Sequence, residues 1–186
     1  MNFLKLFLLI IALNFSNILW AQESVNCDKL IEKDKIKYKE GETTPFTGTC
    51  LIKFPSGMTM IESNYKDGKL EGLEKTYFNN GQKESEVYYI AGKFNGKYIW
   101  YYPNGQKKTE DIYVNDYKYG KATEYYENGQ KESEGVYDNC RETGLWTYWY
   151  ENGQKKAEGE YKIALKSGEW KYWDKNGNPL KEAPKE

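Results

Sequence analysis

GLWTYWYENGQKKAEGEY, residues 144–161, is the stretch that decides the fold of this chain. Its first seven residues are rich in the aromatic side chains that favour β-strands. Asn152-Gly153 follows, a dipeptide typical of tight hairpin turns in which both central residues have positive φ. The next eight residues, 154–161, form the return strand. The stretch therefore predicts a β-hairpin, and residues 161–168 predict a looser connection to the next one.

The same pattern recurs every 24 residues along most of the chain. The glycines of the turns stand in one column: Gly57, Gly81, Gly105, Gly129, Gly153 and Gly177. A second glycine column keeps the same spacing: Gly48, Gly72, Gly96, Gly120, Gly144 and Gly168. Fixed spacing of this kind is the signature of a repeat protein, in which each unit packs only against its neighbours. We therefore predict an all-β fold, an elongated single-sheet array of six tandem antiparallel β-hairpins.

The sequence predicts a chain of four parts. The first is a secretory signal peptide at residues 1–21, where Lys5 precedes an apolar run and Ala21 offers a small residue at the cleavage site. The apolar run is too short to span a membrane. The other parts are an N-terminal cap with a half-repeat, the repeat domain and a C-terminal tail: 22–47, 48–182 and 183–186. We expect the protein to be exported, to the periplasm, the cell envelope or the surroundings.

Net charge limits the classes of partner that the chain can bind, and the cysteines predict a disulfide. Removing residues 1–21 takes away one of 27 basic side chains and none of the 28 acidic ones, which leaves a net charge of −2. This balance gives no attraction to nucleic acid and no strong attraction to membranes. Three cysteines remain, and two of them can pair in an oxidising compartment. We expect a disulfide between Cys27 and Cys50, with Cys140 left over.

The residues that support catalysis are scarce. The sequence has no histidine, the commonest general base and metal ligand. One glutamate recurs in each repeat, but equivalent positions lie two strands, about 9.5 Å, apart, too far for direct ligands of one metal ion. The recurring glutamates are Glu62, Glu86, Glu110, Glu134, Glu158 and Glu182. We expect these glutamates to pair with lysines or to be solvated, and four of them stand three residues after a lysine column: Lys83, Lys107, Lys131 and Lys155. We predict no catalytic residue, cofactor or metal site.

Aromatic side chains fill two neighbouring columns just before each turn. The first column holds Phe54, Phe78, Tyr102, Tyr126 and Tyr150. The second holds Tyr77, Tyr101, Tyr125, Trp149 and Trp173. Because adjacent strand residues point to opposite faces, rings line both faces of the sheet. We predict the second column as a partner-binding surface; the alternative, that both columns only hold neighbouring units together, stays open, as does the question of which face is drier.

The pattern Gly-x-x-x-x-Tyr-Tyr-x-Asn-Gly-Gln-Lys-x-x-Glu-x-x-Tyr, clearest at residues 123–137 and 147–161, resembles the MORN-variant (type 2) repeat. The resemblance covers residues 45–182 and extends to the YwqK-type antitoxin family. It implies a scaffold without catalytic residues. We therefore expect an exported, non-enzymatic repeat scaffold that binds a protein partner through its sheet. A toxin-neutralising immunity protein and a glycan-binding module with a ladder of exposed rings are the alternatives.

Overall fold

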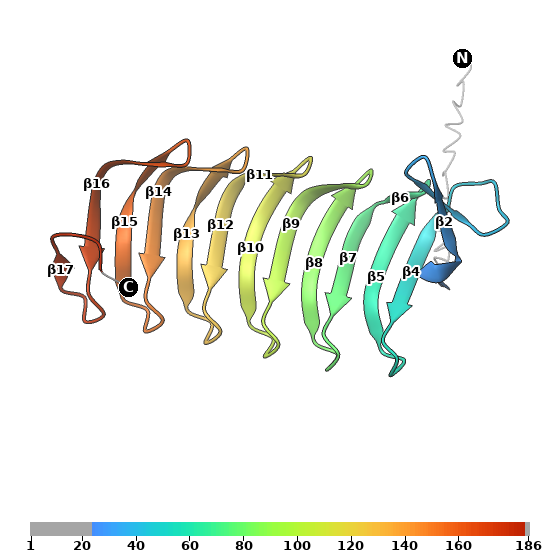
Figure 1. The fold of residues 1–186 in the computed structure, drawn as a ribbon, viewed down its shortest axis with the longest axis horizontal. Coiled ribbons are helices and arrows are strands. Elements are labelled where there is room, and N and C mark those ends of the chain that lie inside the picture. Colours follow the sequence, from blue (N-terminus) through green and yellow to red (C-terminus); the bar gives the residue numbers. More distant parts are fainter. Residues whose placement is uncertain (1–23, 185–186) are drawn as a thin grey trace, which may run out of the picture.

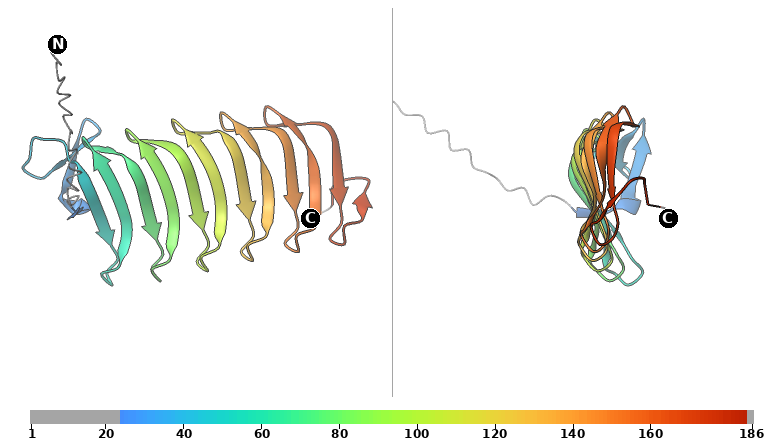
Figure 2. Two further views of the ribbon diagram at one scale, coloured as in Figure 1. Left: turned by 180° about the vertical axis from the view of Figure 1, so that it is seen from behind. Right: turned by 90° about the vertical axis from the view of Figure 1, so that its left-hand side faces the viewer.

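The computed structural model describes residues 24–184, and the predicted signal peptide lies outside them. The described chain forms one long sheet of fifteen strands, a single layer thick when viewed edge-on (Figures 1 and 2). Hairpin follows hairpin along the sheet in chain order from β4 to β17. This is the all-β array of tandem antiparallel hairpins that the sequence predicts.

Twelve strands make up the six hairpins. The first six are β4 (Gly48–Lys53), β5 (Thr59–Lys66), β7 (Gly72–Tyr77), β8 (Lys83–Ile90), β9 (Lys93–Tyr101) and β10 (Lys107–Val114). The other six are β12 (Gly120–Tyr125), β13 (Lys131–Asp138), β14 (Arg141–Trp149), β15 (Lys155–Lys162), β16 (Leu165–Trp173) and β17 (Pro179–Leu180). Two short strands, β6 (Lys69–Leu70) and β11 (Tyr117–Lys118), pair with the ends of β5 and β10.

Tight turns close the hairpins at both edges of the array, which corrects two predictions. In the Asn-Gly turn after Tyr126, only Gly129 has positive φ, 84°, and its amide donates to the Tyr126 carbonyl. This geometry is a type I turn followed by a left-handed glycine, so the prediction of two positive φ angles was wrong. At the opposite edge, the predicted looser connection is a two-residue turn in which Ile163 and Ala164 have φ of 54° and 64°.

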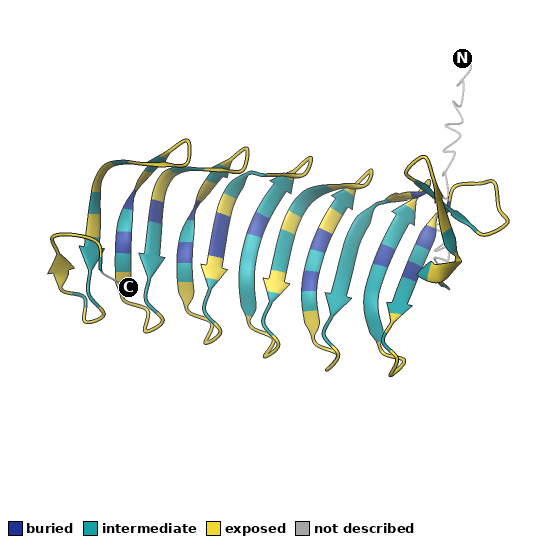
Figure 3. Cartoon of the chain, in the orientation of Figure 1, coloured by how far each residue is buried: buried dark blue, intermediate teal, exposed yellow. Residues whose placement is uncertain are grey.

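The two faces of the sheet differ in burial: buried residues form short dark bands along the strands in Figure 3, and on β8 they stand at alternate positions. On β8, Ser85 and Val87 are buried, whereas Tyr88 and Ile90 on the alternate positions are exposed. The same pattern recurs on β13 and β15. We call the face that carries Ser85 and Val87 the packed face, and the face that carries Tyr88 and Ile90 the open face.

Aromatic rings make the packed face dry. Trp146 is only 4% exposed, and the rings of Tyr137 and Tyr161 meet it edge-on, with centroids 5.2 and 5.9 Å away. Burial raises the pKa of the Tyr137 hydroxyl. The packed face thus supplies most of the apolar burial that holds neighbouring repeats together.

The N-terminal segment covers the first edge of the array. It consists of β1 (Ser24–Asn26), the 3-10 turn η1 (Cys27–Lys29), β2 (Leu30–Lys33) and β3 (Ile36–Lys39). The first of these strands pairs in parallel with β4, and β2 and β3 form a separate two-stranded sheet. A disulfide joins Cys27 to Cys50 on β4, and Phe46, 3% exposed, packs against the Tyr65 ring. The segment is therefore fixed to the first hairpin by a covalent bond, backbone pairing and a buried ring.

Candidate partner-binding surface

The five rings predicted to bind a partner lie in one row on the open face, at the ends of β7, β9, β12, β14 and β16. All five are half-buried. A lysine from the preceding hairpin lies over three of them, with Nζ 5.3 to 5.8 Å from the ring centroid: Lys83 over Tyr101, Lys131 over Trp149 and Lys155 over Trp173. Such cation–π contacts fix the rings in place and cover part of each ring face.

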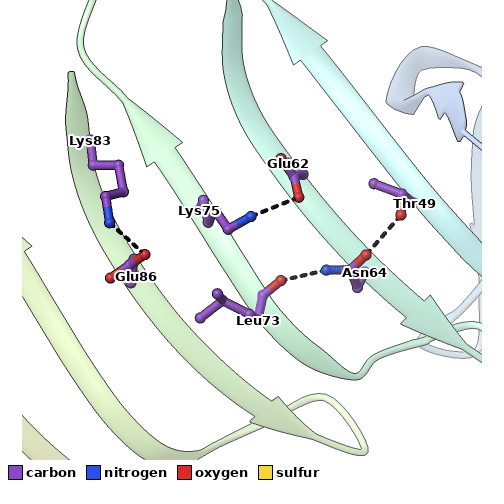
Figure 4. A network of polar contacts seen from close by, with 7 residues as sticks. All are labelled: Thr49, Glu62, Asn64, Leu73, Lys75, Lys83 and Glu86. Carbon is purple, nitrogen blue, oxygen red and sulfur yellow. Dashed lines mark hydrogen bonds and ion pairs between the residues drawn. The ribbon is translucent and has the colours of Figure 1, made fainter. Parts of the chain in front are cut away.

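The same lysines form ion pairs with the glutamates three residues later, as predicted. The N–O distance is 2.9 Å between Lys83 and Glu86 (Figure 4). Equivalent pairs follow along the array: Lys107 with Glu110, Lys131 with Glu134, and Lys155 with Glu158. Hydrogen bonds from Lys107 and Lys97 lower the pKa of Glu110. These glutamates therefore neutralise the lysine column, and no group of residues in the described range 24–184 has the make-up of a metal site.

Exposed apolar side chains also gather on the open face, between the ring row and the two-residue turns, and they form no column of like residues with a 24-residue period in the sequence. They are Tyr88, Ile90, Val114, Tyr117, Val136, Leu145 and Leu165. Their exposed fractions run from 42% at Val136 to 72% at Leu165, whereas Trp100 and Leu180, the exposed large apolar residues on the packed face among the described residues, are each 37% exposed. Single exposed apolar residues are common, but a set confined to one face marks an interaction surface.

The open face changes character along the array. Near its N-terminal end it is polar: the Asn64 amide accepts a hydrogen bond from the Thr49 hydroxyl at 2.7 Å and donates to the Leu73 carbonyl at 2.6 Å (Figure 4). From β7 onward it becomes apolar. A shallow hollow of about 340 Å³ opens there, lined by Leu73, Glu86, Tyr88, Lys97 and Ile99. The candidate surface therefore extends from β7 to β16.

Hydrogen bonds between successive turns set the spacing of the repeats. The Asn128 side-chain amide donates to the Glu151 carbonyl and the Tyr126 hydroxyl donates to the Trp149 carbonyl, both at 2.8 Å. The same bonds recur at Tyr102 to Tyr125, Tyr150 to Trp173, Asn80 to Pro103, Asn104 to Glu127 and Asn152 to Lys175. The turn asparagine thus has two functions: its side-chain oxygen accepts from an amide of its own turn, and its side-chain nitrogen bonds the next repeat. The ring row is thereby held at a fixed period.

One buried ion pair interrupts the aromatic packing of the packed face. The Asp111 carboxylate lies 2.9 Å from the Lys118 ammonium group, which in turn lies 4.7 Å from the centroid of the Tyr137 ring. Burial raises the pKa of Asp111, and the lysine opposes that shift. In the next repeat the position of Asp111 is taken by Gly135, over which a tryptophan ring lies. The pair therefore occupies space that a ring fills elsewhere.

Comparison with known proteins identifies the repeat. The MORN repeat variant family matches residues 70–91, 94–115, 118–139, 142–162 and 166–184, which together make up more than half of the chain. The first hairpin, β4–β5, lies before these matches but has the same strand pairing. No curated protein matches the chain. Over residues 24–184, no helix has both the length and the apolar character needed to cross a membrane. This chain belongs to the MORN repeat variant family.

Proposed function

We propose that this MORN-variant scaffold is exported, has no enzymatic activity, and binds a protein partner through the open face of its sheet. The observation that carries the proposal is the set of seven exposed apolar side chains confined to that face. Protein interfaces combine such an apolar centre with aromatic anchors and a polar rim. Here the ring row from Tyr77 to Trp173 supplies the aromatic anchors, and the lysine–glutamate pairs supply the polar groups.

Two features support export. The apolar segment within residues 1–21 has the layout of a signal peptide. The disulfide between Cys27 and Cys50 forms and persists in oxidising compartments. Exported scaffolds meet partners in the envelope or outside the cell, which sets where the partner should be sought.

The two alternatives from the sequence differ in what they require of the partner. A toxin-neutralising role, which rests on resemblance to the YwqK-type antitoxin family, requires that the partner be a toxin. A glycan-binding role requires free ring faces, but the rings at Tyr101, Trp149 and Trp173 are half-buried with a lysine over each. Partial covering of the stacking surface favours a protein over a sugar chain.

The test is chemical crosslinking in cells of the tagged protein, followed by pull-down from the envelope and mass spectrometry. We expect one stoichiometric protein partner, which is lost when the open face carries Val136→Glu and Leu145→Glu. Ile163→Asn is the matched control, because it also replaces an exposed apolar residue, 59% exposed, but lies in a turn. Retention of the partner by the double variant, with its fold intact by circular dichroism, would refute the proposal. A toxin as the captured partner would establish the immunity role.

A further inference from the structure

A groove of about 770 Å³ lies beside the Asn-Gly turns of the last repeats, on the opposite face from the surface proposed above. Its lining comprises Tyr126, Asn128, Tyr150, Glu151, Asn152, Lys156, Lys175 and Pro184. All but the last two lie on or beside the β12–β13 and β14–β15 turns. Pro184 comes from the segment that follows β17, more than thirty residues further along the chain than Tyr150. The groove is thus lined by two tyrosines and by a proline from the C-terminal segment.

The tyrosines of the groove belong to the first aromatic column, and their polar groups are already in use. The hydroxyls of Tyr126 and Tyr150 donate to the carbonyls of Trp149 and Trp173, at 2.8 and 2.9 Å. These bonds hold each ring by its far end. What remains for a ligand is therefore the apolar surface of the rings, with Lys156 nearby, its Nζ 5.8 Å from the Tyr150 ring centroid.

The spacing of this column matches one backbone conformation. Equivalent residues of successive hairpins lie two strands apart, which is about 9.6 Å at ordinary strand spacing. A polyproline II helix has three residues per turn and rises about 3.1 Å per residue, so every third residue returns to the same side after about 9.3 Å. From Tyr102 through Tyr126 to Tyr150 the two periods differ by only about 0.6 Å in total.

We propose that this groove is a second binding site, which takes a proline-containing segment in the polyproline II conformation. The segment runs along the long axis of the sheet, across the strands, and places a proline against each tyrosine in turn. Aromatic-lined grooves recognise such segments because the ligand loses little conformational entropy on binding. Pro184 occupies one of the proline positions in the free protein and competes with the ligand for it.

The experiment measures binding of a fluorescent thirteen-residue peptide, with proline at every third position, to the full chain by anisotropy. A peptide of the same composition with prolines four residues apart is the control for register. We expect the periodic peptide to bind and the control to bind at least about tenfold more weakly, since each aromatic anchor contributes more than 1 kcal/mol. Tyr126→Ala should weaken binding by about tenfold, Tyr126→Phe should retain it, and Pro184→Ala should strengthen it.

Three results would overturn the inference: no binding of the periodic peptide even by the Pro184→Ala variant, equal binding of both peptides, or binding of cellohexaose in place of either peptide. Tyr126→Phe keeps the ring and loses one hydroxyl, so it separates a failed fold from a failed site. Partner capture by the open face is measured on the same variants. Pro184 lines the groove but makes none of the bonds that hold the ring row, so Pro184→Ala should leave that capture unchanged, and the two proposals therefore fail independently.

Discussion

Replacement of Gly135 by alanine tests the packing of the packed face, because a tryptophan lies directly over this glycine. A Cβ atom at Gly135 would stand 2.1 Å from Cδ2 of Trp146, far inside contact distance. The ring cannot move freely, since it is 4% exposed and held between Tyr137 and Tyr161. We expect Gly135→Ala to lower the free energy of unfolding by about 1–3 kcal/mol, the usual cost of overpacking.

The effect of Gly135→Ala on the free energy of unfolding should reverse its sign when the Trp146 ring is absent. Trp146→Ala alone removes a buried aromatic side chain and costs about 3–5 kcal/mol. In that background the added methyl group of Gly135→Ala meets open space. Because Gly135 has no positive φ, alanine there should then stabilise the protein by about 0.4–1 kcal/mol through the unfolded chain. The predicted coupling between the two substitutions is about 1.5 kcal/mol or more.

The assay is urea unfolding of the four proteins of this cycle, followed by tryptophan fluorescence and circular dichroism together. Agreement of the two probes establishes whether a single free energy describes the transition, which repeat arrays do not guarantee. Gly159, over which the Trp170 ring lies in the same way, provides a second cycle in the next repeat. Equal cost of Gly135→Ala with and without Trp146 would show that the ring is not what excludes a side chain there.

Three further predictions concern the turns, the cap and the acid limit of stability. Asn128→Ala should cost about 1 kcal/mol in urea unfolding by removing its bonds to the next turn and to the Gln130 amide of its own turn. Asn176→Ala, in the final turn, should cost less, and equal costs would mean that these two bonds contribute nothing. Cys50→Ser should destabilise the N-terminal segment by about 3 kcal/mol in hydrogen exchange, whereas Cys140→Ser, at an exposed free cysteine, should not; full protection in the first variant would contradict this. Hydrogen bonds from two lysines lower the pKa of Glu110, so its contribution to the free energy of unfolding is present above the unfolded-state pKa and is lost as pH falls through the lower folded-state pKa. Glu110→Gln should therefore lower the stability of the protein at pH 7 and flatten the decline of stability below about pH 4. An unchanged dependence of stability on pH would exclude this role.

The features that recur in every repeat could be predicted from the sequence. The strand order and the repeat register follow from columns with a 24-residue period, and so do the ion pairs between lysine and the glutamate three residues later in four of the six repeats. Turn geometry could not be predicted as well. Asn-Gly fits both a two-residue turn and the type I turn with a following glycine that is observed, and Ile163 adopts a positive φ that β-branched residues disfavour. Strand pairing on both sides sets that backbone, and no local residue pattern reveals it.

The candidate surface was only partly predictable for a different reason. The ring row from Tyr77 to Trp173 stands in a column with a 24-residue period, which makes it predictable from the sequence. The exposed apolar residues change identity from repeat to repeat, as Tyr88 and Val136 do at one equivalent position, so no column reveals them. Only the alternation within a single strand, Val87 buried and Tyr88 exposed, indicates their face. The face that is more buried is decided by pairs such as Gly135 and Trp146, which pack against each other across neighbouring strands.

Site-specific photo-crosslinking in cells tests the central claim most directly. Leu165 and Lys166 are adjacent residues of β16 whose side chains point to opposite faces, Leu165 to the open face and Lys166 to the packed face over the Trp170 ring. A photoreactive amino acid is placed at each position in turn, and at Leu145 as a second position on the open face. We expect one and the same protein to be crosslinked from Leu165 and from Leu145, and none from Lys166. Crosslinks from Lys166 alone, or from none of the three positions, would contradict it.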